Sequence, residues 1–305
     1  MPAAAAYHTP VLVTEVVELL RGGSRVLDGT LGGGGHSEAL LEAGVAHVVG
    51  VDRDPQAVAA ACARLDEFSR AGRFVGVVGN YADVAGSPAG GSFDGVLLDL
   101  GVSSHQFDDV ERGFTFREGA RLDMRMGDEA MSAADLLNAA SQDDLVTIFK
   151  DYGDERRANR LARAIVQRRA RGLFATSDDF VRAIRSALGP RSGPPDFARL
   201  FQAVRIAVND EIGSLARALP AFRDGLTAGG VLAVITYHSG EDRVVKHAFR
   251  EWSAACVCPP RQPRCTCRGR ALGATITRRA LVPTSGEVDR NPRARSAKLR
   301  AWRAT

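Results

Sequence analysis

The sequence predicts an α/β protein in which a doubly wound parallel sheet carries an inserted all-helical subdomain. Short apolar segments alternate with helical segments over residues 25–98, and this alternation is typical of parallel strands joined by right-handed crossovers. Strand patterns stop near residue 110, and four helical segments follow one another before strands resume near residue 230. The chain has 305 residues, of which 45% are hydrophobic, and this suits one large domain with an insertion.

The first half of the chain supplies four of the expected strands. Each is a short apolar run that ends at a turn or a polar residue. A glycine-rich turn follows the first strand, and the second helix begins at Pro55, a residue type favoured in the first turn of a helix. The expected strands span residues 25–27, 47–51, 74–78 and 93–98, and the expected helices between the first three span residues 37–43 and 55–65.

The inserted segment reads as four consecutive helices. Ser132 and Ser141 are expected to cap the first two, and the third has an apolar face opposite a face filled with arginines. The sequence GPRSGPPD at residues 189–196 combines glycine and proline as a linker does, and it closes the insertion. The four expected helices span residues 133–139, 142–150, 154–171 and 177–188.

The sheet pattern resumes after the insertion. Leucine, valine and isoleucine recur at spacings of three and four over residues 200–219, which predicts one long helix. A strand, a helix and a closing pair of strands follow, at residues 230–236, 243–252, 274–279 and 298–302. We therefore expect a sheet domain formed by residues 1–109 and 197–305, and a substrate-recognition subdomain at residues 110–196.

Charge is unevenly distributed along the chain. Residues 261–305 hold twelve Arg or Lys and two acidic residues, a local net charge of +10 in a chain whose total is +4. Such a basic segment favours a polyanionic partner such as a nucleic acid, because neutralised phosphates release counterions; the alternative is a solvated basic tail. The opening residues show no signal-peptide pattern and no apolar run reaches the length of a membrane span, so we expect a cytoplasmic protein.

The turn after the first strand is rich in glycine. Residues 26–36 read VLDGTLGGGGH, and glycines here let the backbone approach a nucleotide-like ligand closely. No register of this segment satisfies G-x-G-x-x-G, the pattern that binds the pyrophosphate of nicotinamide cofactors. A cofactor without a pyrophosphate fits better. The alternative is a flexible turn with no ligand.

Two acidic residues end strands at the edge where ligands of open α/β sheets bind. Asp52 follows the second strand and can accept hydrogen bonds from both hydroxyls of a ribose; the alternative, a helix cap, suits Asp54 better. Asp99 follows the fourth strand, where a carboxylate can hold an exocyclic amine with its lone pair facing a methyl donor. Ser103 and Ser104 lack the G-x-S-x-G pattern of an acyl-transfer nucleophile.

Further polar side chains leave alternatives open. His238 follows the strand at residues 230–236 and is a candidate proton acceptor or substrate contact, or else a surface residue beside a capping Ser239. In the insertion, Arg156, Arg157 and Arg160 are candidates for contacts with RNA phosphates. A cluster of four cysteines is a candidate zinc site, but its C-x-C spacing favours a reduced loop without metal. These cysteines are Cys256, Cys258, Cys265 and Cys267.

Eight short motifs in order resemble the family of 16S ribosomal RNA cytosine N4-methyltransferases named ribosomal RNA small subunit methyltransferase H. The resemblance spans nearly the whole chain and is carried by YHTPVL at 7–12, DGT at 28–30 with GGHS at 34–37, VDRDP at 51–55, LDLGVSS at 98–104, ERGF at 111–114, LDMRM at 122–126, FQAVRI at 201–206 and NPRARS at 291–296.

This resemblance implies a Rossmann-like fold, S-adenosylmethionine as the cofactor and a cytosine in the decoding region of 16S rRNA as the substrate, within the small ribosomal subunit. It implies that the cofactor site is lined by Gly34, Gly35, His36, Asp52, Tyr81, Asp99 and Gln106. Only Asp52, Asp99 and the glycines also follow from the residues alone. Tyr81, Gln106 and the identity of the base rest on the resemblance.

Three other functions are weighed against this one. DNA amino-methyltransferases usually carry a Pro-Pro-aromatic segment after the fourth strand, where this chain has Asp99-Leu-Gly-Val. A nicotinamide-dependent oxidoreductase is disfavoured by the incomplete glycine pattern. A non-catalytic ribosome-assembly factor with a vestigial cofactor pocket is disfavoured by the presence of Gly34, Gly35, Asp52 and Asp99, and a methylation assay separates it from an enzyme.

Overall fold

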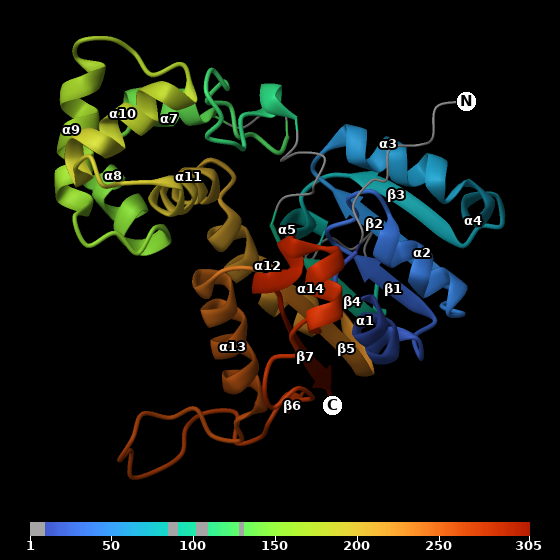
Figure 1. Cartoon of the computed structure of the whole chain (residues 1–305). Helices are drawn as coiled ribbons and strands as arrows, with labels where there is room; N and C mark the ends of the chain where they lie inside the picture. Colours follow the sequence, from blue (N-terminus) through green and yellow to red (C-terminus); the bar gives the residue numbers. More distant parts are fainter. Residues whose placement is uncertain (1–9, 85–90, 102–108, 128–130) are drawn as a thin grey trace. The chain divides into compact units, whose positions relative to one another are not determined.

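The computed structural model describes residues 10–84, 91–101, 109–127 and 131–305 (Figure 1). The chain divides into two compact units. Residues up to 101 together with residues 212–305 form the first, which we name the sheet unit. Residues 102–211 form the second, which we name the helical unit.

The sheet unit is built on a seven-stranded sheet whose strands lie in the order β3-β2-β1-β4-β5-β7-β6. The first five strands are parallel, and β7 runs antiparallel to both β5 and β6. The bounds are β1 Arg25–Asp28, β2 His47–Asp52, β3 Phe74–Val78, β4 Phe93–Asp99, β5 Leu226–Thr236, β6 Gly273–Thr275 and β7 Lys298–Ala304. The predicted α/β fold class is confirmed.

Helices cover both faces of this sheet. Along β4, Leu97 belongs to one apolar core, while its neighbours Val96 and Leu98 belong to another, because successive side chains of a strand point to opposite faces. The helices of the sheet unit are α1 Val13–Leu20, α2 Gly35–Glu42, α3 Pro55–Arg64, α4 Asp66–Arg70, α5 Tyr81–Val84, α12 Glu211–Gly225, α13 Ser239–Ser253 and α14 Ser285–Arg290.

The helical unit has an apolar core of its own. The rings of Phe149, Phe180 and Phe201 pack together there, with centroids 5.9 Å apart for the first pair and 4.9 Å for the second. Ser132 and Ser141 cap the first two helices with capping boxes, as predicted. The elements are a 3-10 helix at Val110–Arg112, α7 Ala133–Ala139, α8 Gln142–Thr147, a π-helix at Ile148–Tyr152, α9 Ala158–Arg169, α10 Ser177–Leu188 and α11 Pro194–Val208.

The expectation of a single long helix over residues 200–219 is wrong, because two helices, α11 and α12, cover this range. α11 ends at Val208 because the side chain of Asn209 turns to the backbone of residues 124 and 126, donating to Met124 O at 2.8 Å and accepting from Met126 N at 2.9 Å. Asp210 then takes a left-handed conformation with φ of 46°, which a helix cannot continue through.

The helical unit also extends beyond the subdomain expected at residues 110–196. α11 lies within it, because Phe197, Leu200 and Phe201 belong to its apolar core. The linker-like segment at residues 189–196 therefore lies within one unit: residues 189–193 turn between two helices, and residues 194–196 begin α11. In the part of the chain that the structure describes, no helix is both long and apolar enough to cross a membrane.

Candidate active site

Three neighbouring strands of the sheet each end in an aspartate. Asp28 ends β1, Asp52 ends β2 and Asp99 ends β4, and the strand order places β1 between the other two. Since the three strands are parallel, the three carboxyl groups stand at the same edge of the sheet. Asp28 is buried, whereas Asp52 and Asp99 are half-buried. Three acidic groups at one edge favour a ligand that carries a positive charge.

The glycine turn after β1 is shaped to leave room at this edge. Gly32 has φ of 50°, and a Cβ built there would meet only the carbonyl oxygen of Thr30, at 4.0 Å. Gly34 has φ of 79° and precedes α2, where a Cβ would come within 3.2 Å of Ala61 and Leu65. Glycine is therefore favoured at Gly34 by its positive φ and by close packing, and at Gly32 it keeps open a space that a ligand can use.

Asp52 is fixed by the backbone on both sides. Its Oδ2 accepts from Gly32 N at 2.8 Å, and its Oδ1 accepts from Asp54 N at 2.9 Å. Asp54 in turn caps α3 by accepting from Gln56 N at 3.0 Å, as the sequence indicated. Burial raises the pKa of Asp52 above its ordinary value, although the two backbone donors oppose this shift. Each carboxylate oxygen retains acceptor capacity for a ribose hydroxyl.

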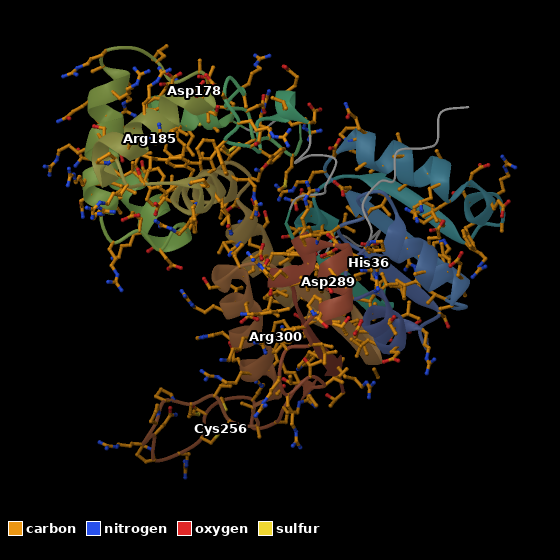
Figure 2. All side chains as sticks on the ribbon, in the orientation of Figure 1. His36, Asp178, Arg185, Cys256, Asp289 and Arg300 are labelled. Atoms are coloured by element: carbon orange, nitrogen blue, oxygen red, sulfur yellow. The ribbon has the colours of Figure 1, made fainter. Side chains whose placement is uncertain are left out.

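Asp28 and His36 lie beside the glycine turn. Asp28 Oδ2 accepts from the Ser37 hydroxyl at 2.7 Å, and burial raises the pKa of Asp28 above its ordinary value. His36 lies in the first turn of α2 and is 6% exposed (Figure 2). Its Nε2 donates to Val11 O at 2.9 Å, and its Nδ1 lies 3.7 Å from Asp99 Oδ2. Since a carbonyl only accepts, Nε2 carries a proton and Nδ1 faces the carboxylate.

Asp99 has a second partner that sequence reasoning missed. The hydroxyl of Tyr237 donates to Asp99 Oδ1 at 2.8 Å, and the Tyr237 backbone N–H donates to Glu241 Oε2 at 2.8 Å. Burial, and then the charge of Asp99, raise the pKa of Tyr237 well above 10, so the phenol remains a donor. The available signal was its place directly after β5, at the same edge as Asp99. One oxygen of Asp99 is thus held by a phenol and the other faces an imidazole.

His238 caps α13. Its Nδ1 accepts from Glu241 N at 3.4 Å, while Glu241 Oε2 accepts from His238 N at 3.3 Å. Its Nε2 lies 3.1 Å from Glu241 Oε1, although this buried nitrogen makes no well-directed hydrogen bond. The alternative in which Ser239 caps this helix is therefore wrong. A ring nitrogen used for capping suits positioning of the loop after β5 better than proton transfer.

The other predicted cofactor residues differ in their surroundings. Tyr81 is 8% exposed at the start of α5, and its ring packs in the core with a centroid 6.4 Å from that of Phe222. Gly35 begins α2, where a Cβ would lie 3.0 Å from the ring of Pro10. Gln106 lies outside the described residues.

Comparison with known proteins agrees with this geometry. Residues 5–305 match the model of the MraW methylase family. The chain belongs to this family. It is 64% identical over 301 residues to the ribosomal RNA small subunit methyltransferase H of Gemmatimonas aurantiaca, covering 98% of this chain and 95% of that protein. The protein of the same name from Heliobacterium modesticaldum is 48% identical, with 97% of each chain covered.

Membership of the methylase family confirms two expectations: the protein is a methyltransferase, and S-adenosylmethionine is its cofactor. Among solved structures, a Streptococcus mutans protein in complex with SAH matches with a TM-score of 0.43 and 10% identity, covering 98% of this chain and 100% of that one. The donor set fits the cofactor, since Asp52 could receive the ribose hydroxyls and the half-buried carboxyl groups of Asp52 and Asp99 would attract a sulfonium cation.

The arginines expected to contact RNA belong to the helical unit of this methyltransferase. Arg156, Arg157 and Arg160 are all exposed at the start of α9. Arg157 is tied to α10, because its Nη1 donates to Leu188 O at 3.0 Å. Arg156 and Arg160 are therefore the better candidates for phosphate contacts.

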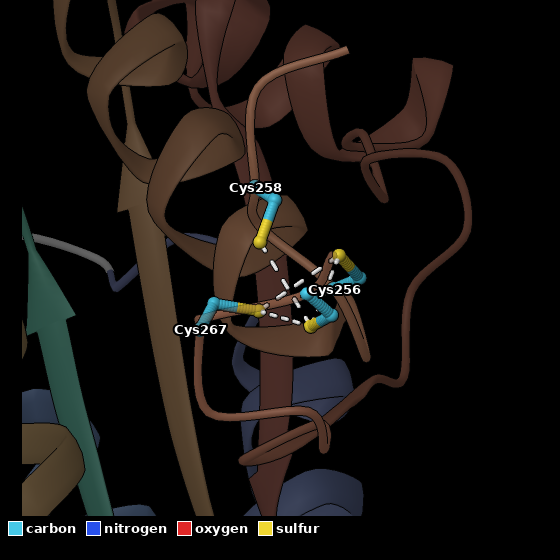
Figure 3. A group of neighbouring side chains, drawn as sticks. Cys256, Cys258 and Cys267 are labelled. Atoms are coloured by element: carbon cyan, nitrogen blue, oxygen red, sulfur yellow. Dashed lines mark hydrogen bonds between the residues drawn. The ribbon is translucent and has the colours of Figure 1, made fainter. Parts of the chain in front are cut away.

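The four-cysteine cluster lies in the loop between α13 and β6 of the sheet unit. Neighbouring sulfur atoms lie 3.5 to 3.9 Å apart (Figure 3). Cys265 and Cys267, which are separated by a single residue, have sulfur atoms 3.5 Å apart. The C-x-C spacing therefore leaves these two sulfur atoms close together, and whether they hold a metal stays a prediction.

Proposed function

We propose that this protein transfers a methyl group from S-adenosylmethionine to the exocyclic N4 amine of a cytosine in the decoding region of 16S rRNA. The observation that carries the proposal is Asp99, half-buried beside the glycine turn and held by Tyr237. The relatives named as small-subunit rRNA methyltransferases support the choice of RNA as the substrate. We also propose that the substrate is the RNA within the small ribosomal subunit and that the protein acts in the cytoplasm.

Methyl transfer to this amine requires a side chain that accepts a hydrogen bond from the amine N–H. It does not require a nucleophilic side chain, because the amine itself attacks the methyl group. The bound cofactor supplies a methyl group whose bond to the sulfonium sulfur breaks as a new bond to the amine nitrogen forms. The cytosine amine is a weak nucleophile because its lone pair is delocalised into the ring. A carboxylate that accepts an N–H from the amine raises electron density on nitrogen and takes up the proton that is released.

Asp99 meets these needs through its partners. The Tyr237 hydroxyl donates to Oδ1 at 2.8 Å and fixes this oxygen, while His36 Nδ1 lies 3.7 Å from Oδ2. A fixed acceptor costs no reorganisation when the amine reacts. Tyr237 is held by Glu241 through its backbone, and we propose that His238 contributes by capping α13 at this loop.

Asp99→Ala tests the proposal. Labelled methyl transfer to unmodified small subunits should produce N4-methylcytidine with the wild-type protein, and the alanine variant should be slowed at least ~100-fold, the usual cost of losing a preorganised polar group. Cofactor binding is measured in parallel. If the wild-type protein binds cofactor but methylates no RNA, the protein is better explained as an assembly factor. If it methylates DNA of the same sequence equally well, the choice of RNA is wrong.

Tyr237→Phe tests the positioning of Asp99. Loss of one hydrogen bond to a charged group should slow methyl transfer by roughly 10- to 100-fold. Cofactor affinity should change little, because the Tyr237 hydroxyl bonds to the amine acceptor. Tyr152→Phe, in the π-helix of the helical unit, is the matched control. Equal rates for the two variants would exclude Tyr237 from the mechanism.

A further inference from the structure

The loop of residues 254–272 connects α13 to β6 and contains neither a helix nor a strand (Figure 1). It holds four of the five cysteines of the chain, all of them exposed or half-buried. An exposed loop of this length has little apolar surface to bury, so another interaction must define its shape. The mechanism proposed above uses no residue of this loop.

The four sulfur atoms are arranged around a common point (Figure 3). Cys265 Sγ lies 3.9 Å from Cys256 Sγ, 3.8 Å from Cys258 Sγ and 3.5 Å from Cys267 Sγ. Cys267 Sγ lies 3.8 Å from Cys256 Sγ, and all four atoms lie within 4.8 Å of one another.

These distances match a metal site rather than disulfides. Sulfur atoms bound at about 2.3 Å from one tetrahedral zinc ion stand about 3.8 Å apart. The sulfur atoms of a disulfide stand only about 2.05 Å apart. Each thiol is also close to more than one other, whereas a disulfide joins thiols in pairs. The arrangement is that of four ligands of one ion.

We propose that Cys256, Cys258, Cys265 and Cys267 bind one zinc ion as four thiolates, and that this ion fixes the loop between α13 and β6. Soft thiolate ligands in a tetrahedral set select zinc among the common divalent cations. All four coordination positions are occupied by protein, which is the pattern of a structural site and leaves none for a substrate.

Groups around the sulfur atoms suit this assignment. Val257 N donates to Cys267 Sγ at 3.3 Å, and such backbone donors stabilise the negative charge on a metal-bound sulfur. Zinc with four thiolates has a net charge of −2, and residues 256–270 contain four arginines and no acidic residue to balance it. Gln262 closes the tip of the loop by donating to Arg264 O at 2.9 Å and to Thr266 Oγ1 at 2.8 Å.

Metal analysis of the purified full-length protein is the first test. Protein prepared without chelators should contain one equivalent of zinc, which should be lost from the Cys256→Ser, Cys267→Ser double variant. Cys62→Ser is the matched control, because Cys62 lies on α3, outside the loop. The control should retain zinc. Stoichiometric iron instead of zinc, or a mass lower by four hydrogens from two disulfides, would overturn the proposal.

Limited digestion with trypsin gives a second measurement that does not depend on whether the double variant folds. Arg261 and Arg264 lie between the two cysteine pairs and are exposed. If the ion fixes the loop, a chelator should speed cleavage at these arginines at least ~10-fold in the wild-type protein, and added zinc should reverse the effect. Cleavage that is equally fast with and without chelator would show that the loop does not depend on a metal. Neither measurement depends on methyl transfer.

Discussion

Asp28 and Asp52 lie at the edge of the sheet in surroundings that disfavour their ionised forms. Burial raises the pKa of both carboxyl groups above their ordinary values. A group whose pKa is higher in the folded than in the unfolded state contributes stability at low pH, and this contribution is lost as the pH rises through the folded-state pKa. Burial therefore disfavours the ionised form of both carboxyl groups, and a cation bound beside them would favour it.

Asp52→Asn should weaken S-adenosylmethionine binding by roughly 10- to 100-fold, since hydrogen bonds to a charged acceptor contribute about 1.5–3 kcal/mol. Wild-type affinity should rise with pH through the raised pKa of Asp52 and then level off, because the ionised form accepts from the ribose hydroxyls. The variant should show a flatter profile. Isothermal titration calorimetry across the acidic to neutral range checks both points.

Asp289→Asn is the control for this change, because Asp289 is exposed on α14 (Figure 2). Its affinity and pH profile should match those of the wild-type protein. Should Asp52→Asn bind the cofactor as tightly as this control does, Asp52 is not the ribose acceptor.

Sequence patterns predict individual site residues only when the backbone alone decides where they lie. Asp52 and Asp99 could be found because they end parallel strands, and strand ends fix a residue's place without knowledge of its side chain. Tyr237 could not be assigned, because only the packed structure shows that its hydroxyl reaches Asp99. The spacing of the cysteines likewise does not fix the distances between their sulfur atoms, because the conformation of the loop sets them.

At the scale of elements, two of the helix caps could be predicted from the sequence. Ser132 and Ser141 cap α7 and α8 through hydrogen bonds between residues three apart, so a short sequence motif contains the whole interaction. The end of α11 depends instead on Asn209 bonding to residues more than eighty positions away. No local pattern can reveal such a bond, and the apolar spacing continues past it.

The arginines at the start of α9 should set the salt dependence of RNA binding. Changing Arg156 and Arg160 to alanine should lower the slope of log affinity against log salt concentration by about 0.7 to 0.9 for each phosphate that the variant no longer neutralises. Binding to small subunits is measured over a series of salt concentrations. Arg21→Ala with Arg70→Ala removes the same charge from exposed positions of the sheet unit and is the control. If the slope of the α9 variant equals that of the wild-type protein, Arg156 and Arg160 do not contact RNA phosphates.

At the scale of the whole molecule, each apolar core of the described residues draws its members from a single unit. One core lies within residues 102–211 and the other two lie within the sheet unit. Calorimetry should therefore show two unfolding transitions. S-adenosylmethionine at 100 times its Kd should stabilise the sheet-unit transition by about 2.7 kcal/mol and leave the other nearly unchanged.

Two core variants assign these transitions. Phe180→Ala should destabilise only the helical unit, by about 3–5 kcal/mol, and Leu97→Ala should destabilise only the sheet unit, by about 2–5 kcal/mol. A single transition that both variants lower equally would show that the two units unfold together.

The order of strands in the sheet has a consequence for synthesis on the ribosome. β7 lies between β5 and β6 and is made after both, and its Trp302 is fully buried. While β7 is still inside the exit tunnel, β5 presents an open, apolar edge that another unfinished chain can pair with. A nascent chain of this methyltransferase must therefore be shielded until residues 298–304 emerge, and a product truncated before them is a natural target for chaperones and proteases.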